Sequence, residues 1–412
     1  MNSSGETRGK RFRIKGWHMI VAVIVAVVGL IVLYSVIMRA RLNRRLEELR
    51  AAGYPTTLAE LAEYNRLPDG AANAAEVYMQ AFAAFTEGPS GLAERLAANQ
   101  QCLALLHQAG AIEDCDYDWD WRTSTSLLTD VKHCAQLLGS AATYYASTGD
   151  PNAAATCIKD GLRLVDSMRR EPALLSYLVR TACTGLTVHS LAESVSATSF
   201  TDEQLAELDK ALTATAGTLD LTQALITERC VMIESCRNPS LMAGPGQSTP
   251  PRMLFGIART GIADTLDYMN GCIEASKLPP KERLTRFHEA AKKMDELSPM
   301  HVMIKMLVPA TGRIAELSLR NQAGVDLART ALAIERYRLA TGKVPERLEE
   351  LVPQYIKDVP VDPFDGQPIR YKREDPGYRL YSILEDGQDN GGKEKSEVTR
   401  GDPYDWPFIV TR

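Results

Sequence analysis

The chain has 412 residues, of which 45% are hydrophobic and 24% charged, and its formal net charge is -5. This length allows two to three domains with sizeable cores, and the composition is that of an ordinary globular protein. The negative net charge gives no broad basic surface for nucleic acid, so no nucleic-acid partner is expected.

The N-terminal region carries the clearest local signal. Residues 1–16 form a basic tail, and residues 19–38 then run without a charge. About 20 apolar residues suffice for a helix to cross a hydrocarbon core of roughly 30 Å. The sequence therefore predicts a transmembrane helix over residues 17–38, with the lipid bilayer as its partner.

A cleaved signal peptide is the alternative interpretation of this segment. Its apolar core would be shorter, and a cleavage site of small residues would follow it. Arg39 and Arg41 follow instead, with further arginines at 44 and 45. We therefore favour an uncleaved anchor.

Residues 39–310 predict a domain of irregular helical hairpins. Leu42, Leu46 and Leu49 recur at helical spacing up to Gly53, and Thr57–Glu60 has the form of a capping box. Residues 141–168 predict two antiparallel helices joined at a Gly-Asp-Pro turn, and this pair resembles one tetratricopeptide-type hairpin. A sustained 34-residue period is absent, so a repeat array is not predicted.

Two features interrupt this helical region. Residues 238–252 are rich in Pro, Gly and Ser and predict a loop, and residues 278–281 predict a shorter break.

All eight cysteines also lie in this helical region, and none forms a C-x-x-C pair. We favour buried thiols as small apolar core residues, with a Cys230–Cys236 disulfide as the alternative.

The composition changes in the C-terminal region, where prolines cluster after Gly342. Residues 369–373 and 378–383 predict short strands, because the second alternates Tyr, Arg and Leu as a half-buried strand does. Turn residues at 365–366 and 375–377 separate them. The sequence thus predicts a mainly α protein with a small C-terminal α+β domain over residues 311–412 that contains a short antiparallel sheet.

Several motifs of this domain resemble the C-terminal region of the major pseudopilins of type II secretion. They are the run from Ala333 to Pro345, Leu-Glu-Glu-Leu at 348–351, Asp-Pro-Phe-Asp-Gly at 362–366, Tyr-Arg-Leu-Tyr-Ser at 378–382, and the glycines at 387, 391 and 392. The resemblance implies a helix packed on a small antiparallel sheet. The whole arrangement of anchor, helical domain and tail also resembles a group of bacterial membrane-anchored proteins.

The N-terminus departs from the pseudopilin pattern. Val21 stands where that family has a glutamate, and about 270 residues separate the anchor from the tail. We therefore expect neither N-terminal processing nor packing into a pseudopilus, although a secretion-system subunit remains a weaker alternative.

Basic residues flank both ends of the anchor, so the positive-inside rule gives nearly equal support to the two orientations in the membrane. The tail favours a cytoplasmic N-terminus, insertion in the inner (cytoplasmic) membrane and an extracytoplasmic body.

The pseudopilin-like loop over residues 385–405 predicts a calcium site. Calcium takes six to eight oxygen ligands on a flexible backbone, and this loop is rich in Asp and Gly. The resemblance implies that Asp386 is the first acidic ligand, with Asp402 and Asp405 as later ones, and Asp389 is a further candidate. A solvated acidic loop is the alternative.

The stretch over residues 113–121 alternates acidic and aromatic residues and could belong to a cation or sugar site. It is not an EF-hand loop, because Trp119 stands where that loop needs Gly and Thr125 where it needs Glu. The alternative is a loop whose aromatic rings enter the core while the acids face water. An extracytoplasmic hydrolase would place its site here, near Asp114, Asp116, Asp118 and Asp120.

No catalytic motif supports an enzyme. No two of the six histidines have the i, i+4 spacing of a metal pair, and the common nucleotide-binding and hydrolase strings are missing. His133 and Cys134 are adjacent on a predicted helix, so their side chains should point in different directions. We therefore expect a non-enzymatic interaction or scaffold protein of the cell envelope, with an unknown envelope protein as partner.

Overall fold

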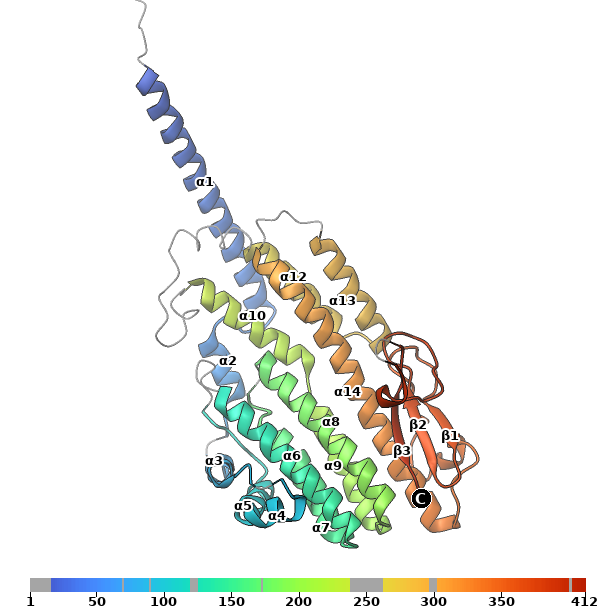
Figure 1. The fold of residues 1–412 in the computed structure, drawn as a ribbon. Coiled ribbons are helices and arrows are strands. Elements are labelled where there is room, and N and C mark those ends of the chain that lie inside the picture. Colours follow the sequence, from blue (N-terminus) through green and yellow to red (C-terminus); the bar gives the residue numbers. More distant parts are fainter. Residues whose placement is uncertain are drawn as a thin grey trace, which may run out of the picture.

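The protein is mainly helical, with one small sheet near its C-terminus (Figure 1). The computed structural model describes residues 16–68, 70–88, 90–118, 125–171, 173–237, 262–295, 302–399 and 402–412. The predicted basic tail up to residue 15 and the predicted loop at 238–252 lie outside these ranges. The mainly α fold and the short antiparallel sheet are confirmed.

Helix α1, Gly16–Ala51, projects from one end of the body (Figure 1). Within the described residues, it is the one helix that is long and apolar enough to cross a membrane. The described large apolar side chains between Met19 and Ile37 are exposed, whereas Leu46 and Leu49 are buried against the body. The predicted anchor and the predicted juxtamembrane helix are therefore one continuous helix, which ends before Gly53 at a φ of 79°.

Ion pairs fasten the last part of α1 to the body. Arg41 lies 2.9 Å from Asp264 and 3.3 Å from Asp267, and Arg45 lies 3.0 Å from Asp267. Both aspartates belong to helix α12, Ile262–Ser276. Packing and charge together hold α1 rigidly to the body.

The other helices form a bundle. Their bounds are α2 Leu58–Asn65, α3 Ala75–Ala84, α4 Leu92–Ala98, α5 Gln100–Gly110, α6 Thr125–Ser147, α7 Pro151–Ser167, α8 Leu174–Ala197, α9 Asp202–Thr218, α10 Leu221–Arg237, α13 Pro280–Asp295 and α14 Val302–Thr341. Short 3-10 helices follow at Leu348–Leu351 and Lys395–Glu397.

The predicted hairpin over residues 141–168 is confirmed as α6 and α7. Gly149 takes a φ of 82°, which suits glycine at a helix end. Asp150 then caps α7 by accepting a hydrogen bond from the Ala153 amide at 3.0 Å, and Pro151 occupies the first helical position. The capping box at Thr201 and Gln204 is present at the start of α9.

Helix α14 joins two hydrophobic cores. The anchor-end core holds Leu46 of α1 with residues of α10, α12 and α13 and with Ile314 of α14. The sheet-end core holds helices α3 to α9, the strands, and α14 from Val325 onwards. The predicted domain boundary at 310/311 falls inside α14, which continues through Pro309 without a break.

The sheet has three antiparallel strands in the order β1-β2-β3. Strands β1, Arg370–Arg373, and β2, Tyr378–Ser382, match the two predicted strands. Strand β3, Trp406–Val410, was not predicted, and it pairs Phe408 with Leu380. The sheet packs beside α14 and α8 (Figure 1).

The Asp-Pro-Phe-Asp-Gly motif has a structural role. Asp362 is fully buried and accepts hydrogen bonds from the Ile383 amide and the Ser382 hydroxyl, both at 2.9 Å. It also lies 3.0 Å from the Arg370 guanidinium. Asp362 therefore ties the loop before β1 to the end of β2.

Candidate functional site

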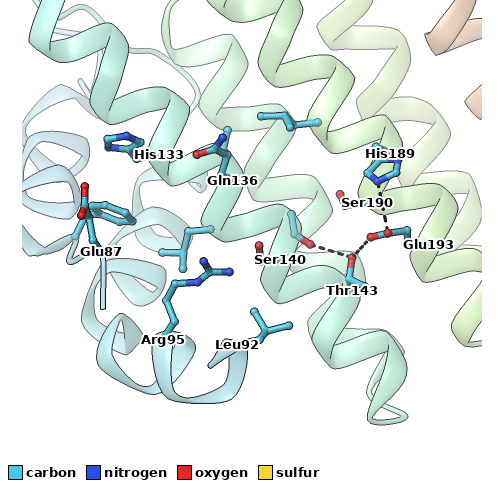
Figure 2. Close-up of a pocket in the computed structure, with 15 residues that line it drawn as sticks. Glu87, Leu92, Arg95, His133, Gln136, Ser140, Thr143, His189, Ser190 and Glu193 are labelled. Atoms are coloured by element: carbon cyan, nitrogen blue, oxygen red, sulfur yellow. Dashed lines mark hydrogen bonds and ion pairs between the residues drawn. The ribbon is translucent and has the colours of Figure 1, made fainter. Parts of the chain in front are cut away.

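A groove of about 670 Å³ lies between α6, α8 and the segment around α4 (Figure 2). Its floor is formed where α6 and α8 meet closely. Gly139 of α6 lies opposite Ser190 of α8, and a Cβ at position 139 would make an ordinary van der Waals contact of 3.5 Å with the Ser190 Cβ. The groove is thus a product of two helices about 50 residues apart in the sequence.

One polar face of α6 follows the groove from end to end. His133, Gln136, Ser140 and Thr143 recur at three- or four-residue intervals and line it. The Thr143 hydroxyl donates to Glu193 at 2.8 Å (Figure 2). Amide, hydroxyl and imidazole groups therefore offer hydrogen bonds along the whole floor.

Helix α8 and the α4 segment supply the remaining sides. On α8, His189 lies 3.5 Å from Glu193 (Figure 2). On the opposite side, the Phe85 ring stacks on His133 at 5.3 Å between centroids, and Arg95 points towards the groove (Figure 2). Apolar and polar groups alternate around the opening.

Among the described residues that line the groove, the hydroxyl groups are not bonded to a histidine base. The Ser190 hydroxyl donates to the Thr187 carbonyl at 3.0 Å, inside its own helix. No hydrogen bond joins a hydroxyl to His133 or His189 among the described lining residues. A nucleophile next to a base is the minimum for covalent catalysis. The described lining residues therefore include no hydroxyl that a hydrogen-bonded histidine would activate.

His133 and Cys134 point in different directions, as predicted. His133 lines the groove, whereas Cys134 is buried, with its Sγ 3.9 Å from Cys102 Sγ. The seven cysteines whose side chains the structure describes are buried free thiols, which confirms the core interpretation for them. Cys230 donates to the Pro55 carbonyl at 3.2 Å, and the side chain of Cys236 lies outside the described residues.

The acidic and aromatic stretch at 113–118 packs onto the bundle. Asp114 pairs with Arg169 and Arg170, and these cations hold the pKa of Asp114 below its usual range. The Tyr117 ring lies 6.4 Å from Phe82 in the sheet-end core, and its hydroxyl lies 2.8 Å from Ser167. Trp119, Asp120 and Trp121 lie outside the described residues, so the hydrolase alternative stays a prediction.

Glu171 lies behind this stretch and was not singled out from the sequence. Its side chain is 1% exposed, and neither carboxylate oxygen has a hydrogen-bond partner of good geometry. Burial raises the pKa of Glu171 to about 8, and the negative charge of Asp116 adds to the rise. Glu171 is therefore held in its neutral form at neutral pH.

Three of the four predicted calcium ligands, Asp386, Asp389 and Asp402, are exposed, and only Asp405 of the four is buried. Asp386 accepts from the Gln388 amide of its own loop at 2.9 Å. Asp405 is 1% exposed and accepts from the Gly392 amide at 2.6 Å, while Asp389 accepts from the Gly391 amide at 2.9 Å. The adjacent Gly391–Gly392 backbone thus brings Asp389 and Asp405 together.

The second oxygen of Asp405, Oδ1, is buried without a hydrogen-bond partner. Burial raises the pKa of this carboxyl, and the charge of Asp389 raises it further. No group of three or more His, Cys, Asp or Glu side chains gathers as a metal site within the described ranges. Asp389 and Asp405 would therefore need backbone carbonyls or water to complete a calcium shell.

Comparisons with known proteins return no relatives. No family model, no curated protein and no solved structure matches this chain.

Proposed function

We propose that this protein is a single-pass membrane protein whose groove binds an extended segment of a partner polypeptide. The observation that carries the proposal is the polar face of α6 opposite Phe85 and Arg95. An extended peptide presents unpaired backbone N–H and C=O groups, and these need hydrogen-bond partners when they are buried. Gln136 and Ser140 supply such partners in a row, and the Thr143 hydroxyl, which donates to Glu193, can still accept a hydrogen bond.

The location follows from the anchor and the tail. Helix α1 places the body next to a bilayer, and the resemblance of the tail to secretion pseudopilins supports the inner membrane with the body outside the cytoplasm. The antiparallel sheet packed on α14 is the arrangement that the resemblance implies. The proposed partner is accordingly an envelope protein, and a link to secretion is part of the proposal.

A groove-filling substitution tests this function. Ser140→Arg places a long charged side chain across the floor, and we expect at least about ten-fold weaker binding, or about 1.4 kcal/mol. The measurement is the affinity of the full chain, in lipid nanodiscs, for peptides selected from a displayed random library.

Ser147→Arg is the matched control. It lies on the same helix, is exposed, and does not line the groove. Circular dichroism should show the same fold for both variants. Peptides that bind both variants equally well would overturn the groove assignment.

Calcium binding by the tail is a second part of the proposal. It is supported by the unpartnered Oδ1 of buried Asp405 and by the nearby carboxylate of Asp389. A divalent cation there would supply the missing partner and neutralise both charges. Its role would be to fasten the loop that precedes β3.

Calcium should raise the unfolding temperature of the full chain, because a ligand that binds only the folded state stabilises it by about 2.7 kcal/mol at 100 times its Kd. The full chain is required, since the sheet shares its core with the helices. Asp389→Asn should abolish the rise, and Asp358→Asn, an exposed control, should keep it. An unchanged unfolding temperature at millimolar calcium would reject the site.

A further inference from the structure

The end of the body from which α1 emerges carries exposed cations for which the described part of the chain provides no ion pair. Arg39 on α1 is exposed, and Lys292 and Lys293 are exposed in the last turn of α13. None of these three forms an ion pair with another described residue. Among the described acids near these cations, Asp264 and Asp267 pair with Arg41 and Arg45, and Glu289, which lines the same cavity as Lys293, pairs with Arg286.

The depth of this end relative to the bilayer follows from α1. Arg41 is three residues beyond Met38, the last residue of the uncharged span, so its backbone lies about 4.5 Å farther along the helix. The headgroup layer on each side of a bilayer is about 5–7 Å thick. Arg41 and its partner Asp264, 2.9 Å away, therefore lie at headgroup depth when α1 is inserted.

The α12–α13 hairpin carries the lysines to the same depth. Helix α12 begins at Ile262, beside α1, and α13 returns antiparallel to it after the short connection at 277–279. Lys292 is as many residues from the middle of this connection as Asp264 is. The two residues therefore lie at about the same depth along the hairpin. Figure 1 shows the ends of α12, α13 and α14 gathered where α1 leaves the body.

We propose that Arg39, Lys292 and Lys293 bind the anionic headgroups of the lipids that surround α1. This inference rests on the proposed membrane insertion. Each Lys or Arg near an anionic surface contributes about a five-fold preference for anionic over neutral lipid. These contacts thus fix the orientation of the body relative to the membrane surface.

Another effect accounts for lysines at this position without lipid. Cations at the C-terminal end of a helix interact favourably with the helix dipole. That interaction does not depend on the lipid, whereas headgroup binding does. A change of lipid composition therefore distinguishes headgroup binding from the interaction with the helix dipole.

The experiment uses the full chain in nanodiscs of phosphatidylcholine, with or without about one third phosphatidylglycerol. Hydrogen–deuterium exchange is followed in the peptide that covers residues 288–295. We expect exchange to slow at least about five-fold in the anionic discs, in line with the preference of one cation. About 0.5 M salt should remove this protection, because it shortens the Debye length to a few ångströms.

Two variants sharpen the test. The double variant K292Q/K293Q should lose the protection in anionic discs. Lys281→Gln should keep it, because Lys281 is exposed at the other end of α13, about 16 Å farther from the bilayer. Inserted protein whose exchange is the same in both discs, or equal protection in K292Q/K293Q, would overturn the headgroup assignment. Failure of the wild type to enter discs at all would instead overturn the proposed membrane anchoring.

Discussion

Gly377→Ala is expected to disrupt the packing of the sheet. Gly377 turns the chain from β1 into β2 with a φ of 95°, a conformation that L side chains rarely adopt. A Cβ at this position would lie 1.8 Å from the Val410 carbonyl oxygen and 2.8 Å from its carbon. Strain and overlap together should cost about 3 kcal/mol or more of unfolding free energy. Urea denaturation of the full chain measures it.

Gly366→Ala separates the two causes. Gly366 also has a positive φ, 75°, but a Cβ there would meet nothing within 4 Å. Only the backbone strain remains, so the unfolding free energy should fall by about 1–2 kcal/mol. Equal losses in the two variants would show that the contact with Val410 does not matter.

Glu171→Gln is expected to stabilise the protein at alkaline pH and to flatten its pH dependence. The folded state keeps the Glu171 proton up to a pKa of about 8, whereas the unfolded chain releases it near the usual value of 4.5. Between these values the folded state binds more protons, so stability falls as pH rises. The slope is about 1.4 kcal/mol per pH unit. Below pH 4.5 the group is protonated in both states and contributes no slope.

The measurement is the unfolding free energy of wild type and variant from pH 5 to pH 9. Gln imitates the protonated carboxyl at every pH, so the two curves should separate progressively up to about pH 8. Glu113→Gln, an exposed change in the same stretch, is the control and should follow the wild type. Parallel curves for wild type and Glu171→Gln would contradict a buried, proton-bearing Glu171.

Elements set by local signals were predictable from the sequence. The α6–α7 hairpin follows from Gly149 and Asp150, and the start of α9 follows from Thr201 and Gln204. Strands β1 and β2 flank a recognisable turn. Each of these depends on residues only a few positions apart, where propensity and capping decide the outcome.

Elements set by distant contacts were not predictable. Strand β3 is only five residues long, contains Pro407 and pairs with a strand 24 residues earlier, so no local pattern marks it. The groove depends on α6 and α8 lying side by side, as the Thr143–Glu193 hydrogen bond shows, and no spacing in the sequence reveals that contact. The sequence shows that the loop is rich in Asp and Gly, but it does not show which aspartates are buried. Asp405 is buried and Asp386 is exposed, and this difference depends on the tertiary structure.

Helix α14 has a mechanical consequence. Its 40 residues reach about 60 Å at about 1.5 Å per residue, and no loop interrupts them between the two cores. A displacement of the strands is therefore carried along one continuous helix to the anchor-end core, which also holds Leu46 of α1.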